Sequence, residues 1–269
     1  MSVIRITASN IHAGLFGVTL TWILEILPYL SENNMHPIWD IHTTCYGNIF
    51  PEIIQSNYKN DVPPIATYNM IQLKHEKTYT FKQSEFQKAH DLFFKFFKIP
   101  NEIKICVDDI VNKFNGKTLG LHYLGTDNME TEASHLTKED FIQQVNVFLT
   151  LSVEYTTIFI ATNEKEFINM INKNFNNTKY LLLYNKSKKS VTNAPIHKGK
   201  DKSVANKLEN GKQAIINSLL LSRCDYVIKT SSCISAWAKI WNPSLEIYNI
   251  NTFFYNWFPD CAIPVKKYV

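Results

Sequence analysis

Residues 118–132 have the sequence TLGLHYLGTDNMETE, in which a short apolar segment runs directly into a polar one. Leu119 and Leu121 are typical of a buried strand, and Gly120 between them would let a neighbouring element approach closely. The polar part contains His122, Thr126, Asp127, Glu130 and Glu132. In open α/β sheets, ligands bind beyond the carboxyl ends of the strands. The stretch is therefore a candidate binding site, although an ordinary loop with a solvated acidic tip would have the same pattern.

Short apolar segments alternate with longer amphipathic ones through the rest of the second half. This alternation predicts parallel strands joined by helices. Strands are expected at residues 119–123, 157–161, 180–184, 224–229 and 245–250, and helices at 137–150, 165–174, 206–221 and 235–241. Thr137 and Asp140 have the spacing of a helix capping box. We therefore expect a Rossmann-like domain over residues 116–250.

The first half begins with the same order of elements. A strand is expected at residues 3–7, a loop containing Gly14 and Gly17 follows, and then come an apolar helix at 18–30 and a strand at 37–41. The two glycines do not complete a G-x-G-x-x-G dinucleotide fingerprint. Close approach of the backbone to a ligand, or tight helix–strand packing, would explain them better.

The domain boundary is expected at Asn115-Gly116, which should end the second of two further helices at residues 84–97 and 102–114. Residues 1–115 would then form an N-terminal Rossmann-like domain, the probable acceptor side, and residues 116–250 the second domain. The aromatic tail, residues 251–269, is expected to pack back onto the body of the protein.

Composition restricts the class of protein. Of the 269 residues, 45% are hydrophobic and 19% charged, which is typical of a globular chain and not of a disordered one. The net charge of +4 is explained by a basic patch for a phosphate-bearing ligand and does not require nucleic-acid binding. Five cysteines without ligand-like spacing predict free thiols. We expect no signal peptide and no stretch that is long and apolar enough to span a membrane, so a cytoplasmic location is expected, in a bacterium or in the host cell of a large virus.

Three short motifs of the second half occur together, in order, in a known family. His122-Tyr-Leu-Gly-Thr-Asp127 with the downstream Glu132 is similar to His-x-Arg-x-x-Asp followed by Glu, and Ile160-Ala-Thr-Asn-Glu164 is similar to a strand-end Ala-Thr-Asp-Asp. Residues 219–232 resemble a helix end followed by a strand that ends in Thr-x-Ser. The family is that of the α-1,6-fucosyltransferases with their nodulation and protein O-fucosyltransferase relatives. The resemblance implies an α/β fold of the GT-B type, two Rossmann-like domains facing each other across a cleft.

The sequence departs from that family at its cationic centre. Leu124 stands where the family has the Arg that holds the donor's phosphates, and Asn128 where a Lys is common. Asn163 replaces the first acid of Ala-Thr-Asp-Asp, and Asn217 replaces the helix acid that contacts base or ribose. The resemblance implies GDP-fucose as donor, but these departures also allow another one, such as UDP-xylose, or a loss of catalysis.

The resemblance implies an inverting transfer of a sugar to a hydroxyl of a glycan. Such a transfer needs a base for the hydroxyl's proton and stabilisation of the leaving diphosphate. Glu132 is the expected base, with Asp127 as second choice or as an orienter of the acceptor. His122 would hydrogen-bond the diphosphate or the sugar, although a satisfied histidine at a strand end is an equal alternative.

Other groups would bind the donor. Backbone N–H groups of Thr230, Ser231 and Ser232, and of the loop with Gly14 and Gly17, could hold the diphosphate. Glu164 and Asn217 would contact ribose or base. The lysine-rich residues 186–202 could add charge, although a solvated basic loop explains them better. No D-x-D motif is present, so we expect no metal and no cofactor beyond a GDP- or UDP-sugar co-substrate.

Two other classes of function stay open. Loss of the family Arg is compatible with a non-catalytic nucleotide- or glycan-binding module. A nucleic-acid binder using the lysine-rich segment would bind with strong salt dependence. The partners we expect are a nucleotide sugar and an oligosaccharide acceptor, without nucleic acid or stable membrane insertion, and the sequence does not indicate an oligomeric state.

Overall fold

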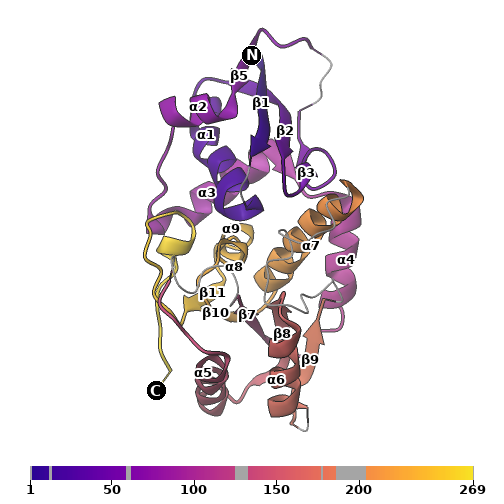
Figure 1. Ribbon diagram of the computed structural model, residues 1–269, viewed down its shortest axis with the longest axis vertical. Coiled ribbons are helices and arrows are strands. Elements are labelled where there is room, and N and C mark those ends of the chain that lie inside the picture. The colour runs from indigo at the N-terminus through magenta and orange to yellow at the C-terminus, as the bar shows by residue number, and fades with distance from the viewer. Residues whose placement is uncertain are drawn as a thin grey trace. The chain divides into compact units, whose positions relative to one another are not determined.

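Two compact units make up the structure, a computed structural model that describes residues 2–11, 14–58, 62–124, 133–176, 178–185 and 204–268 (Figure 1). Unit 1 consists of Met1–Lys104 and Lys200–Ile215, and unit 2 of Ile105–Gly199 and Ile216–Val269. This division differs from the expected boundary after residue 115, since unit 1 ends earlier and takes a segment from the second half. The segment enters helix α7 (Val204–Ser222), which therefore contributes to both units.

A four-stranded sheet with the order β3-β2-β1-β5 forms the centre of unit 1. The strands β1 (Ser2–Ile11), β2 (Met35–Thr43) and β5 (Ala66–Asn69) are parallel, and β3 (Gly47–Asn48) is antiparallel to β2. Alternate residues of β1, among them Ile4 and Ile6, are buried. The expected strand–helix–strand order is confirmed, but β1 is longer than predicted, because Ile11 still pairs with Thr43 of β2 after an irregularity in the register between Ala8 and Ile11.

The remaining elements of unit 1 cover this sheet or precede unit 2. They are a wide helical turn η1 (Leu15–Leu20), α1 (Thr21–Glu32), β4 (Gln55–Ser56), α2 (Met70–Glu76), η2 (Gln83–Glu85), α3 (Phe86–Phe96), β6 (Phe97–Lys98) and the start of α4 (Asn101–Val111). The aromatic residues at helical spacing in the expected helix 84–97 predict core packing, and Phe86, Phe93 and Phe97 are buried, whereas His90 and Phe94 are partly exposed. Because η1 begins at Leu15, Gly17 lies in a helical segment and not in the expected loop.

The expectation that no stretch is long and apolar enough to span a membrane is wrong for η1 and helix α1. Leu15–Glu32 is long and apolar enough, by length and composition alone, to cross a membrane. In the structure 61% of this segment is buried inside the protein, and Ile23, Ile26 and Leu30 have no exposed surface. The core helix of a globular unit has the same character, so the segment is weak support for a span.

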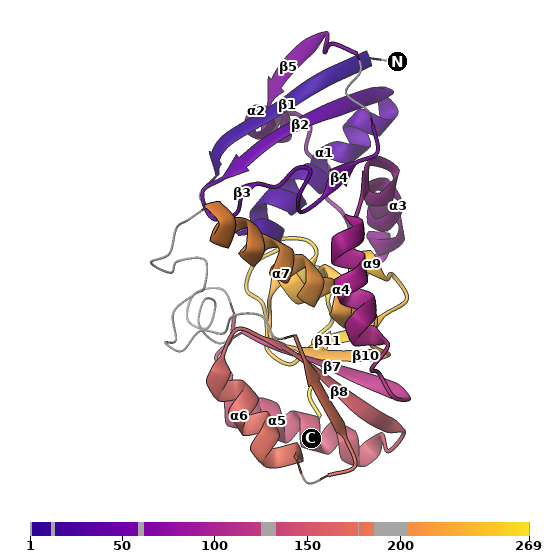
Figure 2. The same cartoon turned by 90° about the vertical axis from the view of Figure 1, so that its right-hand side faces the viewer.

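Five parallel strands form the sheet of unit 2, in the order β11-β10-β7-β8-β9 (Figure 2). They are β7 (Lys117–Tyr123), β8 (Tyr155–Thr162), β9 (Leu181–Tyr184), β10 (Tyr226–Lys229) and β11 (Glu246–Asn249). The chain builds from β7 toward β9 on one side and then returns to add β10 and β11 on the other. The order therefore reverses between β7 and β10, and such a switch point is where open α/β sheets bind ligands.

Helices α5 (Lys138–Leu151) and α6 (Lys165–Phe175) cover one face of this sheet (Figure 2). The capping box predicted at Thr137 and Asp140 begins α5, where the Thr137 hydroxyl accepts from the Asp140 backbone N–H at 3.0 Å. On the other face, a Cβ built on Gly120 would lie 3.0 Å from both Cys224 Sγ and Val227 Cγ2. The close approach expected at Gly120 is therefore confirmed.

The tail belongs to unit 2 and packs through only part of its aromatic run. Phe258, Ile263 and Tyr268 are buried, and a short helical turn, η4 (Asp260–Ala262), lies between them. Phe254, Tyr255 and Trp257 remain 59%, 42% and 45% exposed. Aromatic character predicted that the tail packs onto the body but not which of its rings stay exposed, since large apolar side chains are often left at a protein surface.

Candidate functional site

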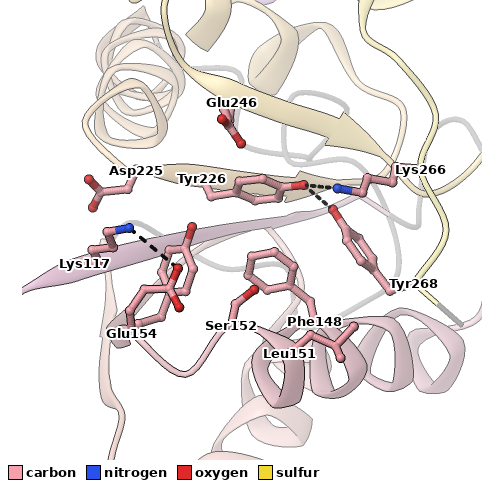
Figure 3. Close-up of a pocket in the computed structure, with 11 residues that line it drawn as sticks. Lys117, Phe148, Leu151, Ser152, Glu154, Asp225, Tyr226, Glu246, Lys266 and Tyr268 are labelled. Carbon is pink, nitrogen blue, oxygen red and sulfur yellow. Dashed lines mark hydrogen bonds and ion pairs between the residues drawn. The ribbon is translucent and has the colours of Figure 1, made fainter.

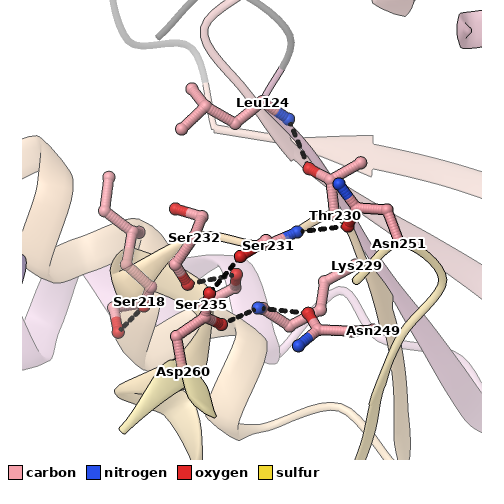
Figure 4. Close-up of polar contacts among 11 residues, drawn as sticks. Leu124, Ser218, Lys229, Thr230, Ser231, Ser232, Ser235, Asn249, Asn251 and Asp260 are labelled. Carbon is pink, nitrogen blue, oxygen red and sulfur yellow. Dashed lines mark hydrogen bonds and ion pairs between the residues drawn. The ribbon is translucent and has the colours of Figure 1, made fainter. Parts of the chain in front are cut away.

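The carboxyl ends of β7 and β10 are tied together at the switch point. The Thr230 N–H donates to the carbonyl oxygen of His122 at 2.9 Å, and the Leu124 N–H donates to Thr230 Oγ1 at 3.0 Å (Figure 4). The neighbouring strand β8 joins through Thr162, whose hydroxyl donates to the carbonyl oxygen of Tyr123 at 2.9 Å. Three strand ends therefore form one rigid edge, and Leu124 stands in it where the related motif has Arg.

His122 lies in this edge and is buried, with 4% of its surface exposed. Burial, and then the nearby positive charge of Lys229, lower the pKa of His122 to about 3, so the imidazole is neutral at pH 7. Its Nδ1 has no hydrogen-bond partner among the described residues. A neutral imidazole with an unpaired buried nitrogen can donate to or accept from a ligand, but it brings no positive charge to a diphosphate.

Asn163 at the end of β8 has a similar feature. Its Oδ1 is buried and has no partner within the described part of the chain. Orphaned buried polar atoms are rare in native structures because each costs free energy. Such atoms also occur elsewhere among the described residues, but those of His122 and Asn163 lie together at the carboxyl ends of neighbouring strands, where a polar ligand would complete their hydrogen bonding.

A buried network of hydrogen bonds and one ion pair fixes the Thr230–Ser232 turn (Figure 4). Lys229 Nζ donates to Asn249 Oδ1 at 2.7 Å and to Asp260 Oδ1 at 2.5 Å, and the Ser231 hydroxyl donates to the other oxygen of Asp260. The Ser231 N–H donates to Asn251 Oδ1 at 2.7 Å. Sequence analysis missed this network, because Asp260 follows Lys229 by 31 positions and lies in the tail.

These contacts restrict what the Thr230–Ser232 turn can offer a ligand. The N–H groups of both Thr230 and Ser231 already donate within the protein. Ser232 differs, since its hydroxyl donates to none of the described residues and its carbonyl accepts from Ser235 Oγ at 3.1 Å. Of the three residues expected to bind the diphosphate, Ser232 is therefore the one whose hydroxyl is available, and Thr230 and Ser231 shape the turn.

Glu164 is buried at the start of α6 and its carboxylate is already engaged. Lys138 Nζ lies 3.1 Å from Glu164 Oε2 and 2.6 Å from Glu166 Oε2. Burial opposes the charge on Lys138, but hydrogen bonds to Glu166 and Glu164 raise its pKa overall. The ion pair between Lys138 and Glu164 joins the first turns of α5 and α6. Glu164 therefore has a structural role in addition to the contact with ribose or base that the sequence predicts.

Asn217 of α7 is also paired. Its Oδ1 accepts from Asn185 Nδ2 at 3.1 Å, and Asn185 directly follows β9.

In unit 1, the carbonyl oxygen of Gly14 accepts from the N–H groups of Val18 and Thr19, both at 3.3 Å, and a Cβ on Gly14 would meet no atom within 4 Å. Tight helix–strand packing therefore does not explain why residue 14 is a glycine, and close approach of its backbone to a ligand remains the other explanation.

The expected base and its neighbours lie outside the described residues, which exclude 125–132 and 186–203. These ranges contain Asp127, Asn128, Glu130, Glu132 and the lysine-rich segment. Across the described parts of the chain, no group of three or more His, Cys, Asp or Glu residues is placed to hold a metal ion.

A cavity of about 580 Å³ opens at the opposite edge of the same sheet (Figure 3). It lies at the amino ends of the strands and is lined by Lys117, Phe148, Leu151, Ser152, Glu154, Tyr155, Asp225, Tyr226, Glu246, Lys266 and Tyr268. Lys117 is paired with Glu154 at 3.6 Å, and Lys266 lies over the rings of Tyr226, Tyr248 and Tyr268. Since its cations are engaged and ligands of α/β sheets bind at the carboxyl ends, we assign the functional site to the latter.

Comparison of the structure with solved structures finds fucosyltransferases. The NodZ α-1,6-fucosyltransferase soaked with GDP-fucose aligns with a TM-score of 0.56 and 14% identity, over 94% of this chain and 98% of that one, and NodZ from Bradyrhizobium with 0.53 and 13%, over 90% and 93%. POFUT1 in complex with GDP aligns with 0.52 and 8%, over 91% and 98%. A mutant of FUT1 from Arabidopsis thaliana, in complex with GDP, aligns with 0.51 and 10%, over 92% and 71%.

These similarities show the fold. The chain has an α/β fold of the GT-B type with two Rossmann-like units, as found in fucosyltransferases, and the expected fold class is confirmed. No protein-family model matches the sequence, and no curated protein matches it.

Proposed function

We propose that this chain is a glycosyltransferase that moves a sugar from a nucleotide-sugar donor to a hydroxyl of a glycan acceptor. The observation that carries the proposal is a pair of buried atoms, His122 Nδ1 and Asn163 Oδ1, which lie at the carboxyl ends of β7 and β8 and have no hydrogen-bond partner among the described residues. They lie beside the switch point of a sheet whose structural relatives were solved with GDP or GDP-fucose. A nucleotide sugar bound there would supply the missing hydrogen-bond partners.

We base the choice of donor nucleotide on the ligands of the similar solved structures and on the groups that could bind the diphosphate. A GDP-sugar is the first choice because the similar solved structures contain GDP or GDP-fucose. Leu124 removes the family's phosphate-binding charge and neutral His122 does not replace it, so a UDP-sugar such as UDP-xylose is the second choice. The Ser232 hydroxyl would hydrogen-bond the diphosphate in either case.

The mechanism we propose is a single inverting displacement without a metal ion. Glu132 would accept the proton of the acceptor hydroxyl as its oxygen attacks the anomeric carbon, and the nucleoside diphosphate would leave from the opposite face. Asp127 would orient the acceptor. Both residues are assigned from the sequence motif. We also propose a cytoplasmic location on the sequence features alone.

Thermal shift with a panel of nucleotides tests the donor. GDP, GDP-fucose, UDP and UDP-xylose should be compared, each with and without EDTA, because a ligand that binds only the folded state raises the melting temperature. We expect a shift with one nucleotide class that EDTA does not change. Absence of a shift with every member, at millimolar concentration, would refute the proposal.

The alternative of a non-catalytic binding module is favoured by one observation, the replacement of the phosphate-binding Arg by Leu124. Such a module would give the same thermal shift. The two are distinguished by release of free nucleotide from the sugar donor, with and without glycan, which only the transferase would catalyse.

A further inference from the structure

An exposed group of aromatic rings lies in the loop Thr252–Trp257, which we call the aromatic loop. The rings of Tyr255 and Trp257 are stacked, with centroids 4.7 Å apart and an interplanar angle of 11°. The Phe253 ring packs edge-on against both, at 5.9 Å and 6.2 Å. Tyr255 and Trp257 nevertheless remain 42% and 45% exposed, and Phe254 is 59% exposed. The stack therefore presents aromatic surface to solvent in a fixed arrangement.

Both ends of the aromatic loop are anchored to the turn at the candidate site. Before the loop, Asn251 Oδ1 accepts from the Ser231 N–H at 2.7 Å. After it, Asp260 accepts from the Ser231 hydroxyl and from Lys229 Nζ. The loop is thus closed on Ser231 by two independent contacts, one to its backbone and one to its side chain.

A third anchor connects the aromatic loop to the end of the expected catalytic segment. The Ser134 N–H donates to the carbonyl oxygen of Thr252 at 2.8 Å, and the Thr252 N–H donates to Ser134 Oγ at 2.8 Å. Ala133 forms an antiparallel bridge with Phe253. Ala133 directly follows Glu132 in the sequence, so the aromatic loop is joined to both chain segments that carry the proposed transfer chemistry.

The chemistry of the aromatic loop identifies its ligand class. Residues 252–257 are Thr-Phe-Phe-Tyr-Asn-Trp and contain no charged side chain. A nucleic acid or an acidic protein would need cations here. A neutral sugar ring suits the surface, because its C–H groups carry partial positive charge and pack against the negative face of an aromatic ring, while its hydroxyl groups stay in water.

We propose that the aromatic loop binds the sugar rings of a neutral oligosaccharide acceptor, with Tyr255 and Trp257 as the stacking platform. This inference rests on the proposed transferase function and adds to it the surface that binds the glycan acceptor and the acceptor's lack of charge. The anchoring through Ser231 holds the platform at a fixed distance from the donor-binding edge. Exposed apolar patches of this kind mark binding surfaces.

Binding can be measured without any transfer activity. Titration calorimetry with maltohexaose, cellohexaose and chitohexaose should show that at least one binds, and the same hexasaccharide should protect tryptophan fluorescence from acrylamide. Trp257 should contribute most to such quenching, because it is 45% exposed, whereas Trp22 is partly buried and Trp39, Trp237 and Trp241 are at most 7% exposed. Failure of all three to bind or protect at millimolar concentration would overturn the proposal.

Variants assign the binding to the platform. Trp257→Ala should raise the Kd of the oligosaccharide about tenfold, as expected for the loss of one stacked ring, and Trp257→Phe should keep most of the affinity. Leu151→Ala, at another exposed apolar residue of unit 2, is the matched control and should bind like the unmodified protein. Equal affinity in Trp257→Ala would refute the assignment.

The same variants separate this inference from the proposed function. Trp257→Ala should leave the nucleotide-induced shift in melting temperature unchanged. If no nucleotide gives a shift while an oligosaccharide binds at Trp257, the transferase proposal fails and the sugar platform stands. If nucleotides bind but none of the three oligosaccharides binds, the platform fails and the donor site stands.

Discussion

Lys229 Nζ lies 2.5 Å from Asp260 Oδ1, and neither side chain has exposed surface. Lys229 ends β10 and Asp260 lies in the tail, so this ion pair fastens the tail to the edge of the sheet where the candidate site lies. Burial lowers the pKa of Lys229, and the charge of Asp260 and its hydrogen bond oppose that shift. Because Asp260 also accepts from Ser231, it positions the Thr230–Ser232 turn without being aimed at a ligand itself.

Asp260→Asn should therefore destabilise the protein strongly. Removing one partner of a buried ion pair leaves the other charge uncompensated and costs about 3–5 kcal/mol. Urea denaturation followed by far-UV circular dichroism measures this loss. The double variant Lys229→Met/Asp260→Leu, which removes both charges, should be more stable than Asp260→Asn. A loss below about 1 kcal/mol in Asp260→Asn would show that the pair does not hold the tail.

His122 should make stability depend on pH. Its pKa is lowered to about 3 in the folded protein, against an ordinary value of 6.5, so the unfolded chain binds the proton first as the pH falls. The stability that neutral His122 contributes is complete above pH 6.5 and is lost as the pH falls toward 3. Between pH 6.5 and pH 5 the loss is on the order of 2 kcal/mol.

Comparison with His122→Leu isolates this contribution. The free energy of unfolding, measured by urea titration at pH 5, 6 and 7, should fall less steeply in His122→Leu than in the unmodified protein. His42→Gln, at an exposed histidine of β2, is the control and should keep the steep dependence. Parallel pH profiles for His122→Leu and the unmodified protein would contradict the proposed burial of a neutral imidazole.

Local patterns in the sequence predicted most elements of unit 2. The apolar run at Leu119 to Tyr123 gave β7, and Thr137 and Asp140 marked the start of α5 at the correct residue. Both signals are short-range. In unit 1, β5 (Ala66–Asn69) was missed because it is an edge strand with partly exposed side chains, so it has no apolar alternation to detect.

The candidate site was predicted only in part. The strand ends at His122 and Thr230 were found, since a polar residue after an apolar run is a local signal. The partners that shape the turn, Asp260 and Asn251, were not, because pairing over 20 to 31 positions has no periodicity. The tail was expected to pack back onto the body, but the exposure of Tyr255 and Trp257 was not predicted, because hydrophobic character alone does not say which large side chains a fold leaves at its surface.

Two glycine variants should differ in their effect on stability. In Gly120→Ala the new methyl group would lie 3.0 Å from Cys224 Sγ and Val227 Cγ2, so the core must shift, at a cost of about 1–3 kcal/mol. In Gly14→Ala no atom lies within 4 Å of the methyl group, and the backbone angles of φ −63° and ψ 147° suit alanine. We expect Gly14→Ala to be neutral or more stable by up to about 1 kcal/mol.

Gly14→Ala then tests whether a ligand approaches this backbone. If the nucleotide packs against Gly14, the variant should bind it more weakly in calorimetry while keeping its melting temperature. Unchanged nucleotide affinity would remove Gly14 from the donor site. Gly120→Ala is the control for this measurement. Because it should be less stable, any change in its nucleotide affinity shows the effect of reduced stability alone.

Glu132→Gln should abolish transfer and leave nucleotide binding intact. An amide cannot accept the proton of the acceptor hydroxyl, although it has nearly the shape of the carboxylate. Release of nucleotide from the sugar donor in the presence of glycan measures transfer, and thermal shift measures binding. Asp127→Asn is the comparison, and as an orienter it should lower the rate without abolishing it. Transfer by Glu132→Gln at the unmodified rate would exclude Glu132 as the base.

Leu124→Arg should strengthen nucleotide binding. The Leu124 N–H donates to Thr230 Oγ1 at 3.0 Å, which fixes the backbone at the end of β7, and the leucine side chain is only partly buried. A guanidinium here can form charge-assisted hydrogen bonds with a diphosphate, each worth about 1.5–3 kcal/mol, so affinity should rise at least tenfold. Calorimetry with GDP and UDP at two salt concentrations measures the gain, which should shrink at high salt. Leu124→Met, an uncharged control of similar volume, should bind as the unmodified protein does, and equal affinities of Leu124→Arg and Leu124→Met would show that the diphosphate does not lie beside residue 124.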